Sequence, residues 1–387
     1  MLKRCLVFLL AILFININCY AEEKKEDLEL SSKSAVLMDV NTGTVIYNMN
    51  GNERVSPASI TKIMTLLITF EELEKQNIML DDMVVTSEYA MSMGGSQVFL
   101  EEGEKQTVED MIKCIVISSG NDASVAIAEH ISGSESAFVK RMNEKAAELG
   151  MYDTHFEDCC GLSESDNHYT TAKDVALMSR ELLFRYPEIT KYSTIWMDTI
   201  THVTKKGNSE FGLSSTNKLL KMICDFEVTG LKTGSTSKAK YCLSASGKKD
   251  NIELVAVVMA APDYKTRFSE ARTMLEYGFS ICKMYTDKDE KRYEIDVKGG
   301  TKKIVSGNVK TEFSHLFLNN EDVSKVKKKV VYVEKLNAPV EKGEIIGRVT
   351  YLYEDKNIGN VDIVAMETVK KAKYTFYLKM VLDKILF

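Results

Sequence analysis

Ser59 and Lys62 are the residues whose types and spacing most directly suggest chemistry. They stand three positions apart in the segment 57–65, PASITKIMT, and positions i and i+3 share one face of a helix. A serine hydroxyl becomes a strong nucleophile only when a base takes its proton, and a partly desolvated lysine can be that base near neutral pH. Because many helices show this spacing, the pair alone is a weak signal.

A second polar motif, Ser119-Gly120-Asn121, follows an apolar run at 108–118. A loop there would place two polar side chains at the mouth of a site. Ser119 is predicted to relay a proton to the leaving nitrogen, and Asn121 to orient a substrate amide or hold Lys62. Taken alone, the motif is equally compatible with a plain turn between two helices.

The third motif, Lys232-Thr233-Gly234, ends the strand-like run 228–232. On an edge strand Lys232 and Thr233 would face the site and bind a substrate carboxylate, while Gly234 would let the substrate backbone approach. The positive charge of Lys232 is also expected to lower the pKa of Lys62.

A tetrahedral intermediate would also need donors for its oxyanion. We expect these to be the backbone N–H of Ser59 and that of Ser235 or Thr236.

The elements that must position these motifs follow an order typical of an α+β domain. Strands open the region, helices fill its middle, and strands with a final helix close it, which predicts one antiparallel sheet flanked by helices. The predicted elements are a hairpin at 34–47, helices at 59–73, 108–118, 122–131, 136–149 and 172–184, strands at 228–232, 241–246 and 254–260, and a helix at 268–284.

Beyond residue 290 the pattern changes to short strands between Gly, Asn and Lys turns, which predicts a small all-β domain at 291–366 after a catalytic domain at 22–290. The final segment, 367–387, is predicted to be an amphipathic helix that lies on a membrane surface. From Tyr374 onward it is apolar except for a narrow polar stripe, and Lys370 and Lys371 precede it. Packing of this helix on the β domain is the alternative.

The N-terminus resembles a secretory signal. Lys3 and Arg4 precede an apolar run at 6–15, and Ala21 offers a cleavage point, so residues 1–21 are predicted to be a signal peptide. An uncleaved anchor is the alternative. Export would place the protein on the outer face of the cytoplasmic membrane or in the cell wall.

The composition excludes several classes of function. A formal net charge of −6 argues against a nucleic-acid partner. The sequence has no H-E-x-x-H motif and only five histidines, so neither a metal site nor a cofactor is expected. The cysteines beyond the signal show no disulfide framework, and buried free thiols are expected. They are Cys114, Cys159, Cys160, Cys224, Cys242 and Cys282.

In this order the three motifs resemble those of the low-molecular-weight penicillin-binding proteins, the serine-type D-alanyl-D-alanine carboxypeptidases. Further segments that carry the resemblance are 94–97 (GGSQ), 118–123 (SSGNDA), 168–172 (HYTTA), 216–220 (TNKLL) and 230–234 (GLKTG). The resemblance implies a β-lactamase/transpeptidase-like catalytic domain, a β-rich domain, an amphipathic anchor, peptidoglycan peptide stems as substrates, and covalent inhibition by β-lactam antibiotics.

The family pattern also implies a basic residue that holds the terminal carboxylate, and Arg267 stands at the expected place; a surface arginine at a helix start is the alternative. The chain departs from the pattern at Ser235, at Cys160 in Cys160-Gly161-Leu162, and at Lys240. None of these departures is expected to touch the Ser59–Lys62 pair, so they bear on substrate preference more than on activity.

The sequence therefore predicts a carboxypeptidase that removes the terminal D-alanine through an acyl-enzyme on Ser59. Alternatives on the same scaffold are a β-lactamase and a DD-endopeptidase or transpeptidase. Against the β-lactamase, Glu164 has the wrong spacing to act as the deacylating glutamate of class A enzymes. A non-catalytic cell-wall protein is disfavoured because all three motifs are intact.

Overall fold

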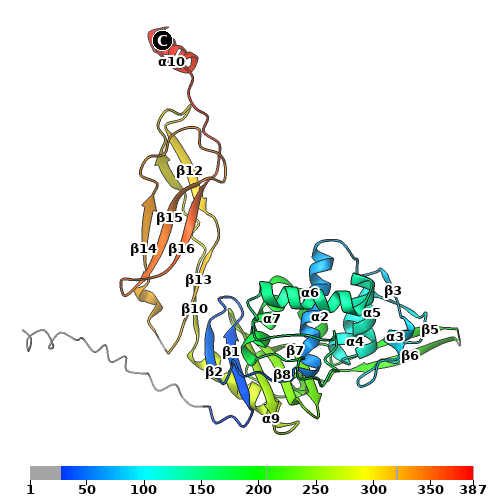
Figure 1. The fold of residues 1–387 in the computed structure, drawn as a ribbon. Coiled ribbons are helices and arrows are strands. Elements are labelled where there is room, and N and C mark those ends of the chain that lie inside the picture. Colours follow the sequence, from blue (N-terminus) through cyan, green and yellow to red (C-terminus); the bar gives the residue numbers. More distant parts are fainter. Residues whose placement is uncertain (1–27, 206, 320, 387) are drawn as a thin grey trace, which may run out of the picture. The chain divides into compact units, whose positions relative to one another are not determined.

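The computed structural model describes residues 28–205, 207–319 and 321–386. Within these residues the catalytic part is organised around a five-stranded antiparallel sheet that combines its first and last strands, as the sequence predicted (Figure 1). The strands in sheet order are β2 (Val45–Met49), β1 (Ser34–Asp39), β9 (Ile252–Ala261), β8 (Lys240–Lys249) and β7 (Glu227–Thr236). β7 is an edge strand, so one of its sides is open to a ligand.

Both faces of this sheet are covered by helices, which explains why β1 is buried along its whole length. Val36 and Met38 point into the main core, and because side chains alternate along a strand, Leu37 points the other way. There a Cβ on Gly278 of α9 (Thr266–Ile281) would lie 2.7 Å from Leu37, so the helix packs directly on the sheet.

The main core lies between the sheet and a group of helices. These helices are α2 (Lys62–Glu74), α3 (Glu88–Met91), α4 (Val108–Ile117), α5 (Asn121–Ser132), α6 (Glu135–Glu148), α7 (Ala172–Arg185) and α8 (Thr190–Ser193), with 3-10 turns η2 (Ala58–Thr61), η3 (Pro187–Ile189) and η4 (Lys218–Lys221). Paired short strands complete this part, namely β3 (Met83–Val85) with β4 (Lys105–Thr107) and β5 (Met197–Thr204) with β6 (Gly207–Ser214).

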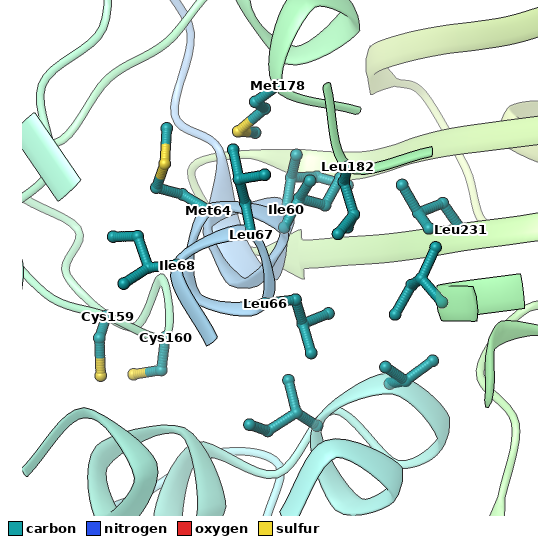
Figure 2. Close-up of a cluster of buried hydrophobic side chains, with 14 of the residues drawn as sticks. Ile60, Met64, Leu66, Leu67, Ile68, Cys159, Cys160, Met178, Leu182 and Leu231 are labelled. Carbon is teal, nitrogen blue, oxygen red and sulfur yellow. The ribbon is translucent and has the colours of Figure 1, made fainter. Parts of the chain in front are cut away.

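Helix α2 is buried on almost every side, as expected of a helix that is apolar around its circumference. Figure 2 shows Leu66, Leu67 and Ile68 projecting from it toward different neighbours, with Met178 of α7 and Cys160 among them. This packing fixes α2, and it therefore fixes Lys62 at its first position.

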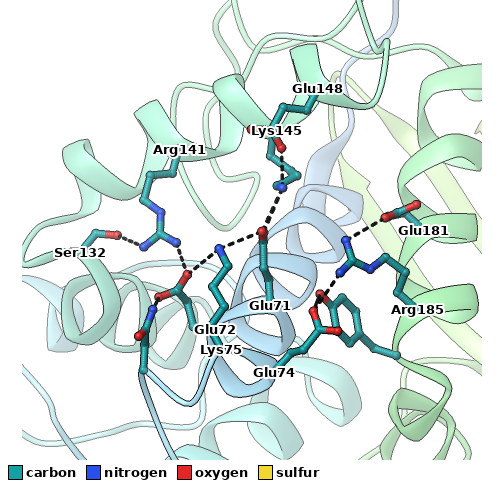
Figure 3. Close-up of polar contacts among 12 residues, drawn as sticks. Glu71, Glu72, Glu74, Lys75, Ser132, Arg141, Lys145, Glu148, Glu181 and Arg185 are labelled. Carbon is teal, nitrogen blue, oxygen red and sulfur yellow. Dashed lines mark hydrogen bonds and ion pairs between the residues drawn. The ribbon is translucent and has the colours of Figure 1, made fainter. Parts of the chain in front are cut away.

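The C-terminal end of α2 is held by ion pairs to two neighbouring helices (Figure 3). Glu71 pairs with Lys145 of α6 at 3.0 Å, and Glu72 pairs with Arg141 of the same helix at 2.6 Å. Glu74 pairs with Arg185 of α7 at 2.9 Å. Each partly exposed pair contributes at most about 1 kcal/mol, so the network orients α2 more than it stabilises the fold.

Several predicted boundaries differ from the structure. The helix predicted at 59–73 begins with η2 before it becomes α2, and the strand predicted at 228–232 is only the first part of β7. The helix predicted at 268–284 ends at Ile281, because the chain then enters strand β10. The β5–β6 hairpin was not predicted.

The β-rich part has a hydrophobic core of its own. β10 (Lys283–Asp287) pairs with β13 (Phe313–Phe317), so this part begins before the boundary expected at 291. The remaining sheet has the order β11 (Tyr293–Asp296), β12 (Ile304–Val309), β16 (Lys356–Ala365), β15 (Ile345–Tyr353) and β14 (Lys327–Tyr332), with the turn η5 (Val323–Lys325) before β14.

The chain ends in helix α10 (Tyr374–Leu386), on which Tyr374, Leu378 and Val381 are exposed. Among the described residues, no helix is both long enough and apolar enough to cross a bilayer. The predicted signal peptide, 1–21, lies outside the described residues. In the described part of the chain all six cysteines are free thiols, and those at 224 and 282 are only partly buried.

Candidate active site

Ser59 and Lys62 meet where η2 passes into α2. The Lys62 Nζ lies 2.9 Å from the Ser59 Oγ, as the i, i+3 spacing predicted. Lys62 is fully buried, whereas Ser59 is half-buried and lines a cleft. The nucleophile candidate is thus open to a ligand while its partner is shielded from water.

The other partners of Lys62 restrict how its amine can be used. Nζ lies 2.6 Å from the Asn121 Oδ1 and 2.6 Å from the carbonyl oxygen of Cys160. Both oxygens can only accept hydrogen bonds, whereas the Ser59 hydroxyl can donate or accept. A neutral amine has two N–H groups and one lone pair, so with both N–H groups donated to these oxygens its lone pair faces the Ser59 hydroxyl. The arrangement suits a general base.

Burial lowers the pKa of Lys62, which favours the neutral form that such a base requires. Cys160, Cys159, Asp158 and Asp122 oppose this shift, in decreasing order of effect. The charge of Lys232 was expected to lower the pKa of Lys62 as well, but Lys232 is not among the groups that shift it. Instead, Lys62 lowers the pKa of Lys232. Its pKa is lowered well below the ordinary value, first by burial and then by the charges of Lys62 and Arg267.

The Ser119-Gly120-Asn121 motif forms the junction between α4 and α5. Ser119 has a positive φ of 63°, and Asn121 is the first residue of α5. This sharp turn directs Ser119 toward Lys232, whose Nζ donates to the Ser119 Oγ at 2.9 Å. Asn121 accepts from Lys62 and donates to the carbonyl of Gly94 at 2.7 Å, which connects the GGSQ segment to the site.

Lys232 and Thr233 lie within β7, not at its end as predicted, and both are buried. The Thr233 hydroxyl donates to the Thr216 Oγ1 at 2.7 Å and lines the cleft. Gly234 lines the cleft and also has a packing role that was not predicted. A Cβ there would lie 2.9 Å from the carbonyl oxygen of Pro57 and 3.0 Å from the Ile60 nitrogen, so its missing side chain lets β7 approach η2.

Arg267 and Ser235 both line the same cleft. Arg267 is buried, not a surface arginine, and its Nη1 donates to the carbonyl oxygens of Gly234 at 3.1 Å and Cys242 at 3.3 Å. Its guanidinium carbon lies 4.7 Å from the Tyr264 ring centroid. These contacts hold a positive charge at the cleft wall.

The expectation that the departure at Cys160 leaves the catalytic pair untouched is wrong. Cys160 supplies its backbone carbonyl to the Lys62 Nζ. Gly161 has a φ of +79°, and a Cβ on it would lie 1.8 Å from the carbonyl oxygen of Ala58, beside the nucleophile. The sequence could not indicate the contact of Cys160, because it is made by a backbone atom. The sequence signal that was available for this close approach is Gly161, the glycine before Leu162.

The cleft around Ser59 has a volume of about 400 Å³. A larger cleft of about 890 Å³, lined by Arg54, Tyr169 and Lys240 among others, contains no residue of the three motifs. We assign the site to the smaller cleft because Ser59, whose Oγ lies 2.9 Å from the Lys62 Nζ, lines it. In it the structure brings together Ser59, Ser119, Thr233, Gly234, Ser235 and Arg267, with Lys62, Asn121 and Lys232 bonded to their neighbours.

Residues 21–263 match the family model described as D-alanyl-D-alanine carboxypeptidase. The chain belongs to this family. Residues 279–371 match the C-terminal domain of penicillin-binding protein 5. The membership agrees with a serine–lysine pair in a cleft beside an edge strand.

Individual relatives of this carboxypeptidase family cover most of the chain. D-alanyl-D-alanine carboxypeptidase DacF of Bacillus subtilis is 42% identical over 92% of this chain and 90% of its own length. DacA of Haemophilus influenzae is 32% identical over 89% and 86% respectively. The solved penicillin binding protein 5 from Haemophilus influenzae has a TM-score of 0.74 at 31% identity, covering 89% of this chain and 99% of its own. The predicted fold class is confirmed.

Proposed function

We propose that this protein removes the terminal D-alanine from peptidoglycan peptide stems through an acyl-enzyme on Ser59. The observation that carries the proposal is the bonding of Lys62, whose two fixed acceptors leave its lone pair for the serine proton. Family membership supports the choice of a D-alanyl-D-alanine substrate.

Acylation begins when the Lys62 amine takes the Ser59 proton and the serine oxygen attacks the carbonyl carbon between the two D-alanines. The backbone N–H groups of Ser59 and of Ser235 or Thr236 hold the oxyanion. The C–N bond then breaks, and the departing amine receives the proton from Lys62 by way of Ser119, which lies 2.9 Å from the Lys232 Nζ. Attack by water on the ester frees Ser59 and leaves the stem one residue shorter.

Residues that line the cleft wall bind the substrate in this proposal. Thr233 and Arg267 line it together, and we assign them the terminal carboxylate. The buried Lys232 precedes Thr233 on β7 and donates to the Ser119 Oγ beside them. Asn121, besides holding Lys62, is suited to an amide of the stem. β-Lactam antibiotics acylate the same serine in this proposal.

The test is digestion of a defined pentapeptide muropeptide, followed by mass spectrometry. We expect a product lighter by one D-alanine from the wild type, no product from Ser59→Ala, and no product after pretreatment with penicillin. An unchanged substrate with folded wild-type enzyme would refute the proposal. Rapid hydrolysis of nitrocefin without release of D-alanine would favour the β-lactamase alternative.

We further infer that residues 1–21 direct export and that α10 binds the outer surface of the cytoplasmic membrane. At 13 residues, α10 is only about 20 Å long, which suits the interface rather than a span. Its exposed apolar side chains follow directly after Lys370, Lys371 and Lys373, all exposed. The backbone pairing of Gly300 with Lys371 places further lysines of the segment 298–303 beside them.

Vesicle sedimentation tests the membrane proposal. The double variant Lys370→Gln/Lys371→Gln is expected to bind anionic phosphatidylglycerol vesicles at least tenfold more weakly, since each basic residue near an anionic surface contributes about 1 kcal/mol. The control Lys327→Gln/Lys329→Gln removes the same charge from the exposed face of β14 and is expected to bind as the wild type does. An equal loss of vesicle binding in both double variants would contradict the proposal that the surface around Lys370 and Lys371 is the one that binds the membrane.

A further inference from the structure

Asp158 is a half-buried carboxylate that belongs to none of the three motifs. Its Oδ1 accepts the backbone N–H of Cys160 at 2.9 Å and also that of Gly161. Its Oδ2 accepts the N–H of Ser163 at 2.6 Å. One side chain therefore accepts from three backbone donors of the turn 160–163, which would otherwise need other partners.

This turn is the part of the chain that contacts the catalytic lysine. The Cys160 carbonyl oxygen lies 2.6 Å from the Lys62 Nζ. One residue earlier, the Cys159 carbonyl accepts from the Thr65 hydroxyl at 2.5 Å, one helical turn along α2. Asp158 and Lys62 thus lie on two sides of the same short backbone segment.

We propose that Asp158 is a positioning residue for Lys62, because its carboxylate fixes the turn whose Cys160 carbonyl directs the lysine amine toward Ser59. The inference rests on the proposed role of Lys62 as the base. Without the carboxylate the turn loses three backbone partners at once. The carbonyl can then rotate away, and the lone pair of Lys62 is no longer held toward the serine hydroxyl.

The charges around Lys62 provide a readout that a purely structural role would not produce. Asp158, Asp122 of α5 and the two neighbouring cysteines each raise the pKa of Lys62 against the stronger effect of burial, and Lys232 of β7 faces it from the sheet. Burial alone would raise the pKa of Asp158 itself. His168 and the three N–H donors outweigh that effect and lower it, so the group is ionised at neutral pH.

Removal of the Asp158 charge must therefore lower the pKa of Lys62 further. Acylation requires neutral Lys62, so its rate falls on the acid side of the pH profile. In a variant without this charge, the acid limb of that profile moves to lower pH, while the plateau rate falls because the amine is less well directed.

The experiment measures acylation of the full chain by a fluorescent penicillin from pH 5 to pH 10, together with the melting temperature. We compare Asp158→Ala and Asp158→Asn with Glu157→Gln, an exposed neighbour that loses the same charge. Asp158→Ala is expected to acylate roughly tenfold or more slowly, because small misplacements of a reacting group cost up to about a hundredfold. Glu157→Gln is expected to stay within about twofold of the wild type.

Asp158→Asn keeps the Oδ1 acceptor for Cys160 and Gly161 and loses only the bond to Ser163, so it answers the question even if Asp158→Ala does not fold. It should show the shifted acid limb with a smaller loss of plateau rate. A folded Asp158 variant with the wild-type rate and profile would overturn the proposal. So would a lower melting temperature with slower acylation but an unmoved profile. If the wild type itself forms no adduct, the proposed function fails instead.

Discussion

Asn121→Asp is the substitution that tests the protonation state of Lys62 most sharply. It replaces the amide oxygen 2.6 Å from the Lys62 Nζ with a carboxylate oxygen of nearly the same shape. The wild-type amide is uncharged and tolerates a neutral amine, whereas an anion at that position favours the ammonium form. The serine would then face a donor instead of a lone pair.

The magnitude follows from the distance. Two unit charges 2.6 Å apart at an effective dielectric constant of about 20 attract by roughly 6 kcal/mol. The new carboxylate is itself buried, so only part of this energy acts on the lysine. Even about a third of it, ~2 kcal/mol, favours protonated Lys62 by about thirtyfold.

The assay is the rate of acylation by a fluorescent penicillin as a function of pH. Asn121→Asp is expected to acylate at least about thirtyfold more slowly at pH 7 and to recover as the pH rises. The exposed Asn167→Asp adds the same charge outside the site and should match the wild type. Loss of the bond from Asn121 to Gly94 would slow acylation at every pH. Acylation of Asn121→Asp at the wild-type rate at pH 7, or a slower rate that does not recover at alkaline pH, would show that Lys62 does not act as a neutral base.

Three further outcomes are expected. Burial lowers the pKa of His168 in the folded protein, so below about pH 6.5 the unfolded chain binds one proton that the folded chain does not. The free energy of unfolding, measured in urea, should therefore decrease as the pH is lowered through this range, and it should decrease less in His168→Gln. Gly161→Ala should lose roughly 3 kcal/mol or more of stability, because its Cβ would overlap the Ala58 carbonyl, while Gly212→Ala, with open space around it, should melt as the wild type does. Arg267→Gln should raise KM roughly tenfold for peptides with a free terminal carboxylate but little for their amides.

Much of the site could be predicted because its functional side chains belong to short motifs whose spacing is visible in the sequence. The i, i+3 spacing of Ser59 and Lys62 requires them to meet on any helical segment, and they do at 2.9 Å even though Ser59 lies on a 3-10 turn. The order of strands and helices along the chain predicted one antiparallel sheet built from both ends of the domain, and β1 does pair with β9, although the strand order itself was not predicted.

The remaining parts depend on backbone atoms and long-range contacts. The Cys160 carbonyl that binds Lys62 comes from a segment 98 residues away and needs no particular side chain. The packing of Gly234 against the backbone at Pro57 could not be foreseen, because only the tertiary fold brings these two segments together. The β5–β6 hairpin was missed because its exposed, polar residues give no clear apolar alternation.

Peptide mass spectrometry of the enzyme after brief exposure to penicillin shows whether Ser59 is the nucleophile. We expect a covalent adduct on Ser59 in the wild type and none in Ser59→Ala. Lys62→Gln, which keeps the serine but removes the base, is expected to form the adduct far more slowly. An adduct on another residue, or none on Ser59 in folded enzyme with Lys62 intact, would contradict the assignment of Ser59 as the nucleophile.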